Sequence, residues 1–231
     1  MPQEPAAAAT TASSPFYQRA FPLLPASTTK TALLLVDIQI GLNTHDTPYY
    51  GRERSNPAFE TNISALLAAV RAFNARSPST SITVIHVYHR SSRSESPLYP
   101  GKASAKIMPC AAPEGDEAVI AKTATSALVG TELEAKIREA GTQQLLICGI
   151  ATDHCVSTTV RAAADLEVCV DAGGESKTTR DGVWIVDDCS ACFDNHGSFD
   201  AEVVHKVNVE SLRGEFCEVT LGEEVKKVML A

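Results

Sequence analysis

The stretch of residues 145–166 constrains the fold more than any other part of the chain, and it reads LLICGIATDHCVSTTVRAAADL. It opens on a short apolar run without alternation, which is typical of a strand buried on both faces. Further along, apolar residues recur at helical spacing, at Val156, Val160, Ala163 and Leu166. A buried strand followed at once by a helix predicts a strand–turn–helix unit of an α/β fold.

Cys155 lies in the turn between this strand and this helix. The first amides of a helix lack intrahelical partners and carry the positive end of the helix dipole, so they stabilise an anion. Such a position is expected to lower the pKa of the thiol, and the thiolate is the nucleophile of cysteine chemistry. The same amides can hold the oxyanion that forms when a carbonyl is attacked. Spacing alone leaves open a small buried cysteine with no chemical role.

Two charged residues end apolar runs elsewhere in the chain. Asp37 follows the dense apolar run of residues 31–36, and Lys122 follows a third predicted strand at residues 117–121. In a parallel sheet the C-terminal ends of the strands form the ligand crevice, and a charge at that depth needs a partner or a site. A turn cap and a solvated edge lysine are the alternatives. The position shared with Cys155 favours convergence on one crevice.

Three ordered motifs resemble the isochorismatase-like cysteine hydrolases, a superfamily that also includes the nicotinamidases. The nucleophile segment of that family is similar to GIATDHCV with the following STTVRAAADL. Its first strand resembles TALLLVDIQIGL, and its lysine segment resembles VIAKTATSALVGTELEAKIREAG. The similarity resumes around residues 183–193. Together with the alternating strands and helices, the resemblance implies a three-layer αβα sandwich with a doubly wound, mainly parallel, six-stranded sheet.

The resemblance also implies roles for individual residues. Cys155 would attack a carbonyl carbon, Asp37 would take its proton and later help to activate water, and Lys122 would hold both charges in position. The backbone amides of Ala151 and Cys155 would form the oxyanion hole, and the family has a cis peptide before the residue that matches Ala151. Candidates for the substrate pocket are Gln39, His86 and Arg90.

His86 and His89 raise the question of a metal site. Their odd separation places them on opposite faces of a regular strand, so they could not share an ion without irregular backbone. Nicotinamidases carry an Asp-x-His pair and further histidines near this position, and the chain lacks that pattern; His45 with Asp46 is a loose alternative. Because fewer than three convincing ligands are visible, we expect neither a metal nor another cofactor.

The CxxC motif from Cys189 to Cys192, followed by His196, is a rival chemical feature. A zinc site would need a fourth ligand and usually a second cysteine pair, and none is spaced for it. Thioredoxin-like chemistry would need the pair at a helix start directly after a strand, which the sequence leaves open. We favour small residues that line the crevice.

Length, charge and cysteine content restrict the number of domains, the class of partner and the cellular compartment. The 231 residues are enough for one sizeable core, and the net charge of −8 argues against a nucleic-acid surface. No apolar run approaches the ~18 residues of a membrane span. The absence of a conventional secretory signal and the seven irregularly spaced cysteines favour a reduced, cytoplasmic setting. We therefore expect a small-molecule substrate, no nucleic-acid or membrane partner and, from the resemblance, a homo-oligomer.

The chain divides into a tail and one domain. Residues 1–28 are rich in Ala, Thr, Ser and Pro and predict a flexible tail, while residues 29–231 form a single isochorismatase-like hydrolase domain. Residues 167–180 extend the family pattern and predict an inserted surface loop or hairpin. Substrate identity is assigned to two long loops, residues 41–57 and 90–105.

These features predict a cysteine-dependent hydrolase that cleaves the C–N bond of a small amide through a thioester on Cys155. Isochorismatase-type cleavage of a vinyl ether is one alternative, and it is disfavoured because that chemistry does not need a cysteine nucleophile. A catalytically idle member that binds a metabolite or a protein is another. The presence of all three catalytic residue types argues against it.

Overall fold

The computed structural model describes residues 21–43, 49–175, 181–194 and 197–231. Its centre is a six-stranded sheet in the order β3-β2-β1-β4-β5-β6, and every neighbouring pair is parallel. The strands are β1 (Thr31–Val36), β2 (Thr83–His89), β3 (Ala118–Lys122), β4 (Gln144–Ile150), β5 (Val183–Ala191) and β6 (Glu218–Thr220). The strand order reverses between β1 and β4, where doubly wound sheets bind their ligands. The predicted fold class is confirmed.

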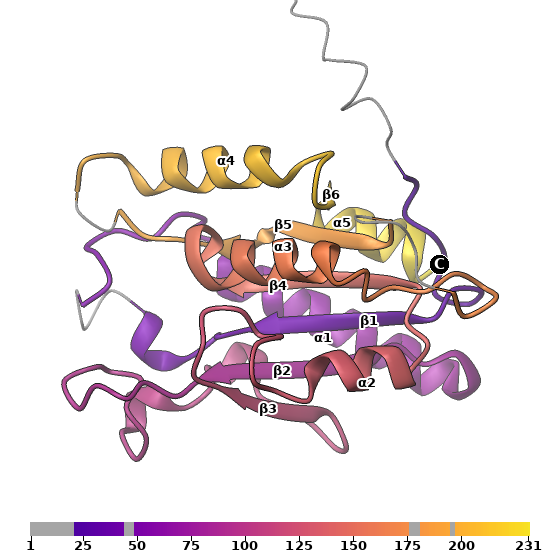
Figure 1. Cartoon of the computed structure of the whole chain (residues 1–231), viewed down its shortest axis with the longest axis horizontal. Coiled ribbons are helices and arrows are strands. Elements are labelled where there is room, and N and C mark those ends of the chain that lie inside the picture. The colour runs from indigo at the N-terminus through magenta and orange to yellow at the C-terminus, as the bar shows by residue number, and fades with distance from the viewer. Residues whose placement is uncertain (1–20, 44–48, 176–180, 195–196) are drawn as a thin grey trace, which may run out of the picture.

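Helices cover both faces of the sheet (Figure 1). On one face, α1 (Phe59–Arg76) packs with the C-terminal turns α5 (Gly222–Glu224) and η7 (Val225–Met229). On the other face lie α2 (Leu133–Glu139), α3 (Ser157–Asp165) and α4 (Ala201–Leu212). Alternate β1 residues supply the two cores: Leu33 and Leu35 face α1, and Leu34 faces the opposite layer. Burial on both faces explains why this strand shows no polar alternation.

Strand β4 runs through Gly149 and ends at Ile150. This glycine has a φ of 136°, and a Cβ atom on it would lie 2.0 Å from the carbonyl oxygen of Val36. Only glycine fits this close approach of β4 to β1. The glycine therefore lets the two strands run together up to the crevice.

Residues 21–28, the last part of the predicted tail, contact the domain. Leu23 and Ala26 are buried in the core, the Leu24 N–H donates to Gln144 Oε1 at 3.0 Å, and the Ala26 N–H donates to the Met229 carbonyl at 2.9 Å. Burial of two apolar side chains and these hydrogen bonds attach residues 21–28 to the domain.

The segment predicted as an inserted surface loop begins inside the protein. Val168 and Cys169 are buried against the core, and a hydrogen-bonded turn around Asp171 follows on the surface. Residues 176–180 lie outside the described part of the chain. Within the described ranges, no helix combines the length and apolar character needed to cross a bilayer.

Candidate active site

Three strand ends bring the predicted catalytic residues to one place. Asp37 directly follows β1 and Lys122 ends β3, while Cys155 lies in the single turn of π-helix Thr152–Val156 after β4. Asp37 adopts a left-handed backbone (φ 53°), and its N–H donates to the Val87 carbonyl at 2.8 Å. Such backbone is sparsely populated and persists where the surrounding structure imposes it. The predicted convergence of the three residues is present.

Lys122 joins the other two residues. Its Nζ lies 2.7 Å from Asp37 Oδ2 and 3.3 Å from Cys155 Sγ, and it also donates to the Ala124 carbonyl at 3.0 Å. The side chains of Asp37 and Lys122 are 1% and 0% exposed. A buried pair of opposite charges in hydrogen-bond contact keeps both groups fixed beside the sulfur.

The electrostatics of the site reverse one expectation. Burial, and then the neighbouring Asp37 carboxylate, raise the pKa of the Cys155 thiol to about 12, although Lys122 acts in the opposite direction. Burial likewise raises the pKa of Asp37, and the charge of Lys122 opposes that rise. The predicted lowering of the Cys155 pKa is therefore wrong, because desolvation and a like charge outweigh the helix amides and the ammonium group. At neutral pH the sulfur therefore holds its proton, and it accepts a hydrogen bond from Lys122 Nζ.

Backbone groups next to the sulfur are arranged around Ala151. The Ile150–Ala151 peptide is cis, as the resemblance implies. The Ala151 carbonyl accepts hydrogen bonds from the amides of His154 and Val156 at 3.0 and 3.1 Å. Among the described residues, the Ala151 N–H makes no hydrogen bond. That amide is free to donate to an incoming oxygen atom.

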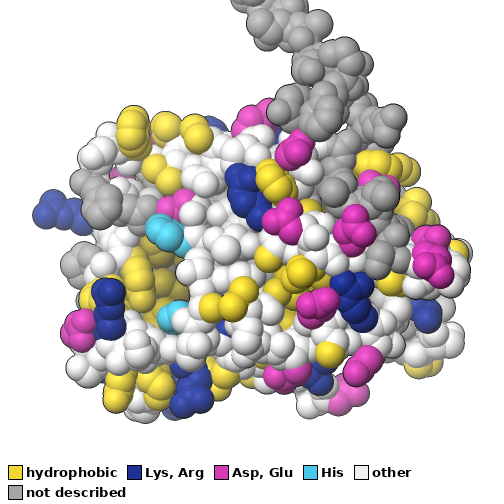
Figure 2. Space-filling model, viewed as in Figure 1, with side chains coloured by type: hydrophobic (Ala, Val, Ile, Leu, Met, Phe, Trp, Pro, Cys, Tyr) yellow, Lys and Arg dark blue, Asp and Glu magenta, His cyan; other side chains and the backbone are white. Residues whose placement is uncertain are grey.

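A cavity of about 190 Å³ opens beside the three residues. Its walls are mostly apolar, and the Tyr50 ring stacks on the Phe193 ring with centroids 6.3 Å apart. Figure 2 shows a hollow of hydrophobic side chains with histidines at its edge. The lining residues are Asp37, Leu42, Tyr50, His89, Leu98, Thr125, Ile150, Ala151, His154, Cys155 and Phe193. Such a site suits a compact, largely apolar molecule with one polar reacting group.

None of the three predicted pocket residues lines this cavity. Gln39 is fully buried: its Nε2 donates to the Ala105 carbonyl at 2.7 Å and its Oε1 accepts from the His89 N–H at 2.8 Å. His86 is buried with its Nε2 2.9 Å from Glu117 Oε2. Both side chains therefore contact the scaffold instead of the cavity: backbone groups hold Gln39, and Glu117 holds one ring nitrogen of His86.

Arg90 lines a neighbouring groove, which shares His89 and Leu98 with the cavity. His89 replaces the predicted histidine at the site, and its Nδ1 lies 3.3 Å from Lys122 Nζ. Burial and the charge of Lys122 lower the pKa of His89. His89 therefore faces the cavity as a neutral ring at neutral pH.

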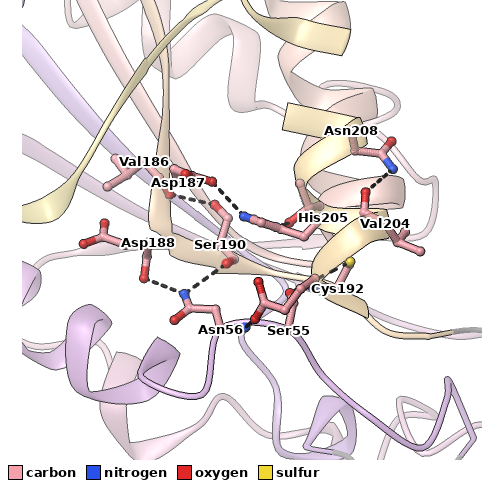
Figure 3. Close-up of polar contacts among 12 residues, drawn as sticks. Ser55, Asn56, Val186, Asp187, Asp188, Ser190, Cys192, Val204, His205 and Asn208 are labelled. Carbon is pink, nitrogen blue, oxygen red and sulfur yellow. Dashed lines mark hydrogen bonds and ion pairs between the residues drawn. The ribbon is translucent and has the colours of Figure 1, made fainter. Parts of the chain in front are cut away.

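The aromatic wall is held by hydrogen bonds between distant segments (Figure 3). The Asn56 Nδ2 donates to the carbonyls of Asp188 and Ser190 at 2.6 and 3.2 Å. The Ser55 N–H donates to the Cys192 carbonyl at 2.9 Å, and the Cys192 N–H donates to Ser55 Oγ at the same distance. These bonds tie the loop that holds Tyr50 to the end of β5, next to Phe193. Sequence reasoning missed both aromatic residues, although each lies in a segment that it had placed near the crevice.

The CxxC motif is part of the core. Cys189 lies inside β5 and Cys192 just after it, and both are fully buried. Burial raises the pKa of Cys192 to about 12 and raises that of Cys189 further. The pair does not start a helix after a strand, so the thioredoxin-like arrangement is not met. Both thiols are inert in these surroundings.

Among the described residues, no group of three His, Cys, Asp or Glu side chains lies close enough together to hold a metal ion. His45, Asp46 and His196, which the sequence analysis considered, lie outside the described residues.

Comparison with known proteins places this geometry in context. A model of the isochorismatase domain matches residues 31–224. Two curated relatives from Bacillus subtilis (strain 168), the uncharacterized isochorismatase family proteins YrdC and YddQ, are each 28% identical to the chain. The YrdC match covers 85% of this chain and 94% of YrdC. The YddQ match covers 58% of this chain and 70% of YddQ.

Solved structures agree with these matches. An isochorismatase-family protein from Chromobacterium violaceum ATCC 12472 is 31% identical, with a TM-score of 0.72 over 91% of this chain and 98% of the other. A cysteine hydrolase from Pseudomonas syringae pv. phaseolicola 1448A has the same fold, with a TM-score of 0.70 at 22% identity over 90% of this chain and 94% of the other.

Proposed function

Because the chain belongs to the isochorismatase family of hydrolases, we propose that it hydrolyses the C–N bond of a small amide through a thioester on Cys155. The observation that carries this proposal is the position of Lys122 Nζ, within hydrogen-bond distance of both the Asp37 carboxylate and the Cys155 sulfur. The apolar cavity in front of the sulfur suits an uncharged acyl group.

In the first half of the reaction, the thiol proton passes to Asp37 as the sulfur attacks the carbonyl carbon. The raised pKa of Cys155 means that the thiol keeps its proton until a substrate is attacked. The raised pKa of Asp37 makes its carboxylate a stronger base for that proton. Charge then moves from Asp37 to the substrate oxygen, where the amides of Ala151 and Cys155 donate hydrogen bonds. Lys122 stays beside the changing charges throughout.

The tetrahedral intermediate collapses by breaking the C–N bond. The leaving nitrogen takes the proton from Asp37 and departs as ammonia or an amine, which leaves the acyl group on sulfur as a thioester. Asp37 is again a carboxylate. It takes a proton from water, which attacks the thioester carbon, and the C–S bond breaks. The sulfur recovers the proton from Asp37, and the product is a carboxylic acid.

Two other activities predict different outcomes for the same assay. Vinyl ether cleavage needs no sulfur nucleophile, so it would survive replacement of Cys155. An idle binding member would turn over no substrate at all. The buried Asp37–Lys122 pair argues against an idle protein, because burying two charges without a use for them is costly. The contact of Lys122 with the Cys155 sulfur favours the amide hydrolase over vinyl ether cleavage.

The test is a screen of small amides with ammonia detection, comparing the unaltered chain with Cys155→Ala and Cys110→Ala. Cys110 is a half-buried free cysteine outside the cavity and serves as the matched control. We expect turnover in the unaltered chain and in Cys110→Ala, none in Cys155→Ala, and an acyl adduct on Cys155 by mass spectrometry of a rapidly quenched reaction. Amide turnover retained in Cys155→Ala would exclude the thioester.

A further inference from the structure

We propose that Asp187, His205 and Thr152 form a hydrogen-bonded chain that positions the turn carrying Cys155, and with it the oxyanion hole. The proposal rests on the function proposed above and assigns it two positioning residues, His205 and Thr152. Neither touches the cavity, and His205 comes from a helix with no other assigned role in the site.

The chain of contacts runs across three elements. His205 on α4 places its Nε2 2.7 Å from Asp187 Oδ1 of β5 (Figure 3). On the other side of the ring, Nδ1 lies 2.9 Å from Thr152 Oγ1, in the π-helical turn after β4. His205 is 5% exposed and Thr152 is fully buried. The Thr152–His205 contact is therefore made away from water, where an unmade hydrogen bond is costly, while the Asp187 side chain is 34% exposed.

Donor and acceptor roles follow from the chemistry of the partners. A carboxylate oxygen can only accept, so the His205 ring donates from Nε2 to Asp187 Oδ1. In the tautomer with its one ring proton on Nε2, Nδ1 is an acceptor, and the Thr152 hydroxyl donates to it. This assignment satisfies every group in the chain, and it fixes the direction of the Thr152 side chain. Valine at position 152 would keep the shape of the side chain but would leave Nδ1 without its donor.

Thr152 is well placed to control the oxyanion hole. It directly follows Ala151 and is the first residue of the turn Thr152–Val156 that carries Cys155, so it lies between the two amides proposed to bind the oxyanion. The far end of this turn has its own anchor: Thr159 Oγ1 donates to the Cys155 carbonyl at 2.6 Å and accepts from the Ala127 N–H at 2.9 Å. His205 supplies the corresponding anchor at the near end. Losing it would let Ala151 shift relative to the sulfur.

The experiment measures amide hydrolysis in Thr152→Val, Thr152→Ser, His205→Gln and the double variant Thr152→Val/His205→Gln. The control is Asn208→Ala, one turn along α4, where the Nδ2 of Asn208 bonds only within its own helix, to the Val204 carbonyl (Figure 3). We expect kcat to fall at least about tenfold in Thr152→Val with KM within about twofold, because misplacement of about 1 Å can cost about a hundredfold. Serine keeps the hydroxyl and should restore kcat.

The double variant provides the sharpest outcome. If one interaction joins the two residues, the double variant loses no more than the more impaired single variant. Losses that multiply would overturn the proposal, as would a Thr152→Ser variant impaired as severely as Thr152→Val. So would a Thr152→Val variant with unchanged kcat.

A second measurement separates this proposal from the proposed function. The rate at which iodoacetamide alkylates Cys155, followed by mass spectrometry, needs no amide substrate. Absence of amide turnover in the unaltered chain would refute the function, whereas equal alkylation rates in the unaltered chain and Thr152→Val would refute the positioning role. Circular dichroism melts of each variant show whether it is folded at the assay temperature.

Discussion

Replacing Asp37 by Asn should make the sulfur more reactive while abolishing hydrolysis. Asn keeps the size of Asp but removes both the base and the negative charge beside Cys155. Asp37 Oδ2 lies 2.7 Å from Lys122 Nζ, which lies 3.3 Å from Cys155 Sγ, so carboxylate and sulfur are at most about 6 Å apart. At an effective dielectric constant of about 20, two unit charges at that distance repel by about 3 kcal/mol.

That repulsion corresponds to about two pKa units. Its removal should bring the Cys155 pKa down from the present value of about 12 to about 10. At pH 9 the thiolate fraction then rises about a hundredfold. A less basic thiolate is also a weaker nucleophile, and this lowers its rate of attack about tenfold. The net result is alkylation about tenfold faster than in the unaltered chain.

The assay follows iodoacetamide labelling of Cys155 by peptide mass spectrometry, beside amide hydrolysis of the same samples. Asp116→Asn is the matched control, because Asp116 is an exposed carboxylate outside the cavity. We expect hydrolysis to fall at least about a hundredfold in Asp37→Asn, the range that loss of a general base covers. Slower alkylation in Asp37→Asn would refute the electrostatic reasoning, and retained hydrolysis would refute the role of Asp37 as the base.

Three further predictions concern pH and packing. Since the pKa of Asp37 is raised and its carboxylate must be ionised to act, kcat/KM should fall as pH falls through that raised pKa. Because the pKa of Cys155 is about 12, the pH–rate profile should show no loss from thiol ionisation below about pH 10. Burial raises the pKa of Glu117, but hydrogen bonds from Arg71 outweigh it and hold the pKa at about 2, below its usual 4.5. Denaturant titrations should therefore show that stability is lost as pH falls from about 4.5 toward 2. That pH dependence should be missing in Glu117→Gln, which should also be about 2 kcal/mol less stable at pH 7. Gly149→Ala should cost more than about 4 kcal/mol of unfolding free energy or prevent folding, because its Cβ would collide with the Val36 carbonyl; a stable, active Gly149→Ala would contradict the strand contact.

The catalytic residues were accessible from the sequence because a parallel sheet converts chain position into spatial position. Asp37 and Lys122 each end an apolar run, and Cys155 follows one, so a single rule about strand ends brings all three to one edge. The resemblance to a known family then added their roles. Both arguments use local sequence only, and that is enough to place Asp37, Lys122 and Cys155 at one edge of the sheet.

Side-chain direction could not be predicted in the same way. Gln39 lies two residues after Asp37, yet its amide is held by the backbone of His89 and Ala105, 50 and 66 positions further along the chain. The Ser55–Cys192 bonds that hold the aromatic wall span 137 positions. Contacts of that range have no periodic signal, so the sequence placed Tyr50 only in the loop of residues 41–57 and could not predict that its ring forms a wall of the cavity.

The pKa of Cys155 was predicted in the wrong direction for a related reason. Position at a helix start is a local feature, and it favours the thiolate. Burial and the field of Asp37 arise only when the sheet is assembled, and they are the larger effects.

A sulfur that keeps its proton at rest has consequences beyond the reaction itself. Peroxide and other oxidants consume thiolates much faster than thiols, so a cysteine with a pKa of about 12 is poorly converted to sulfenic acid. Burial, and then the Asp37 carboxylate, would thereby protect the sulfur between turnovers of the proposed reaction. An isochorismatase-family hydrolase built this way should stay active through oxidative stress without a reductase to restore it.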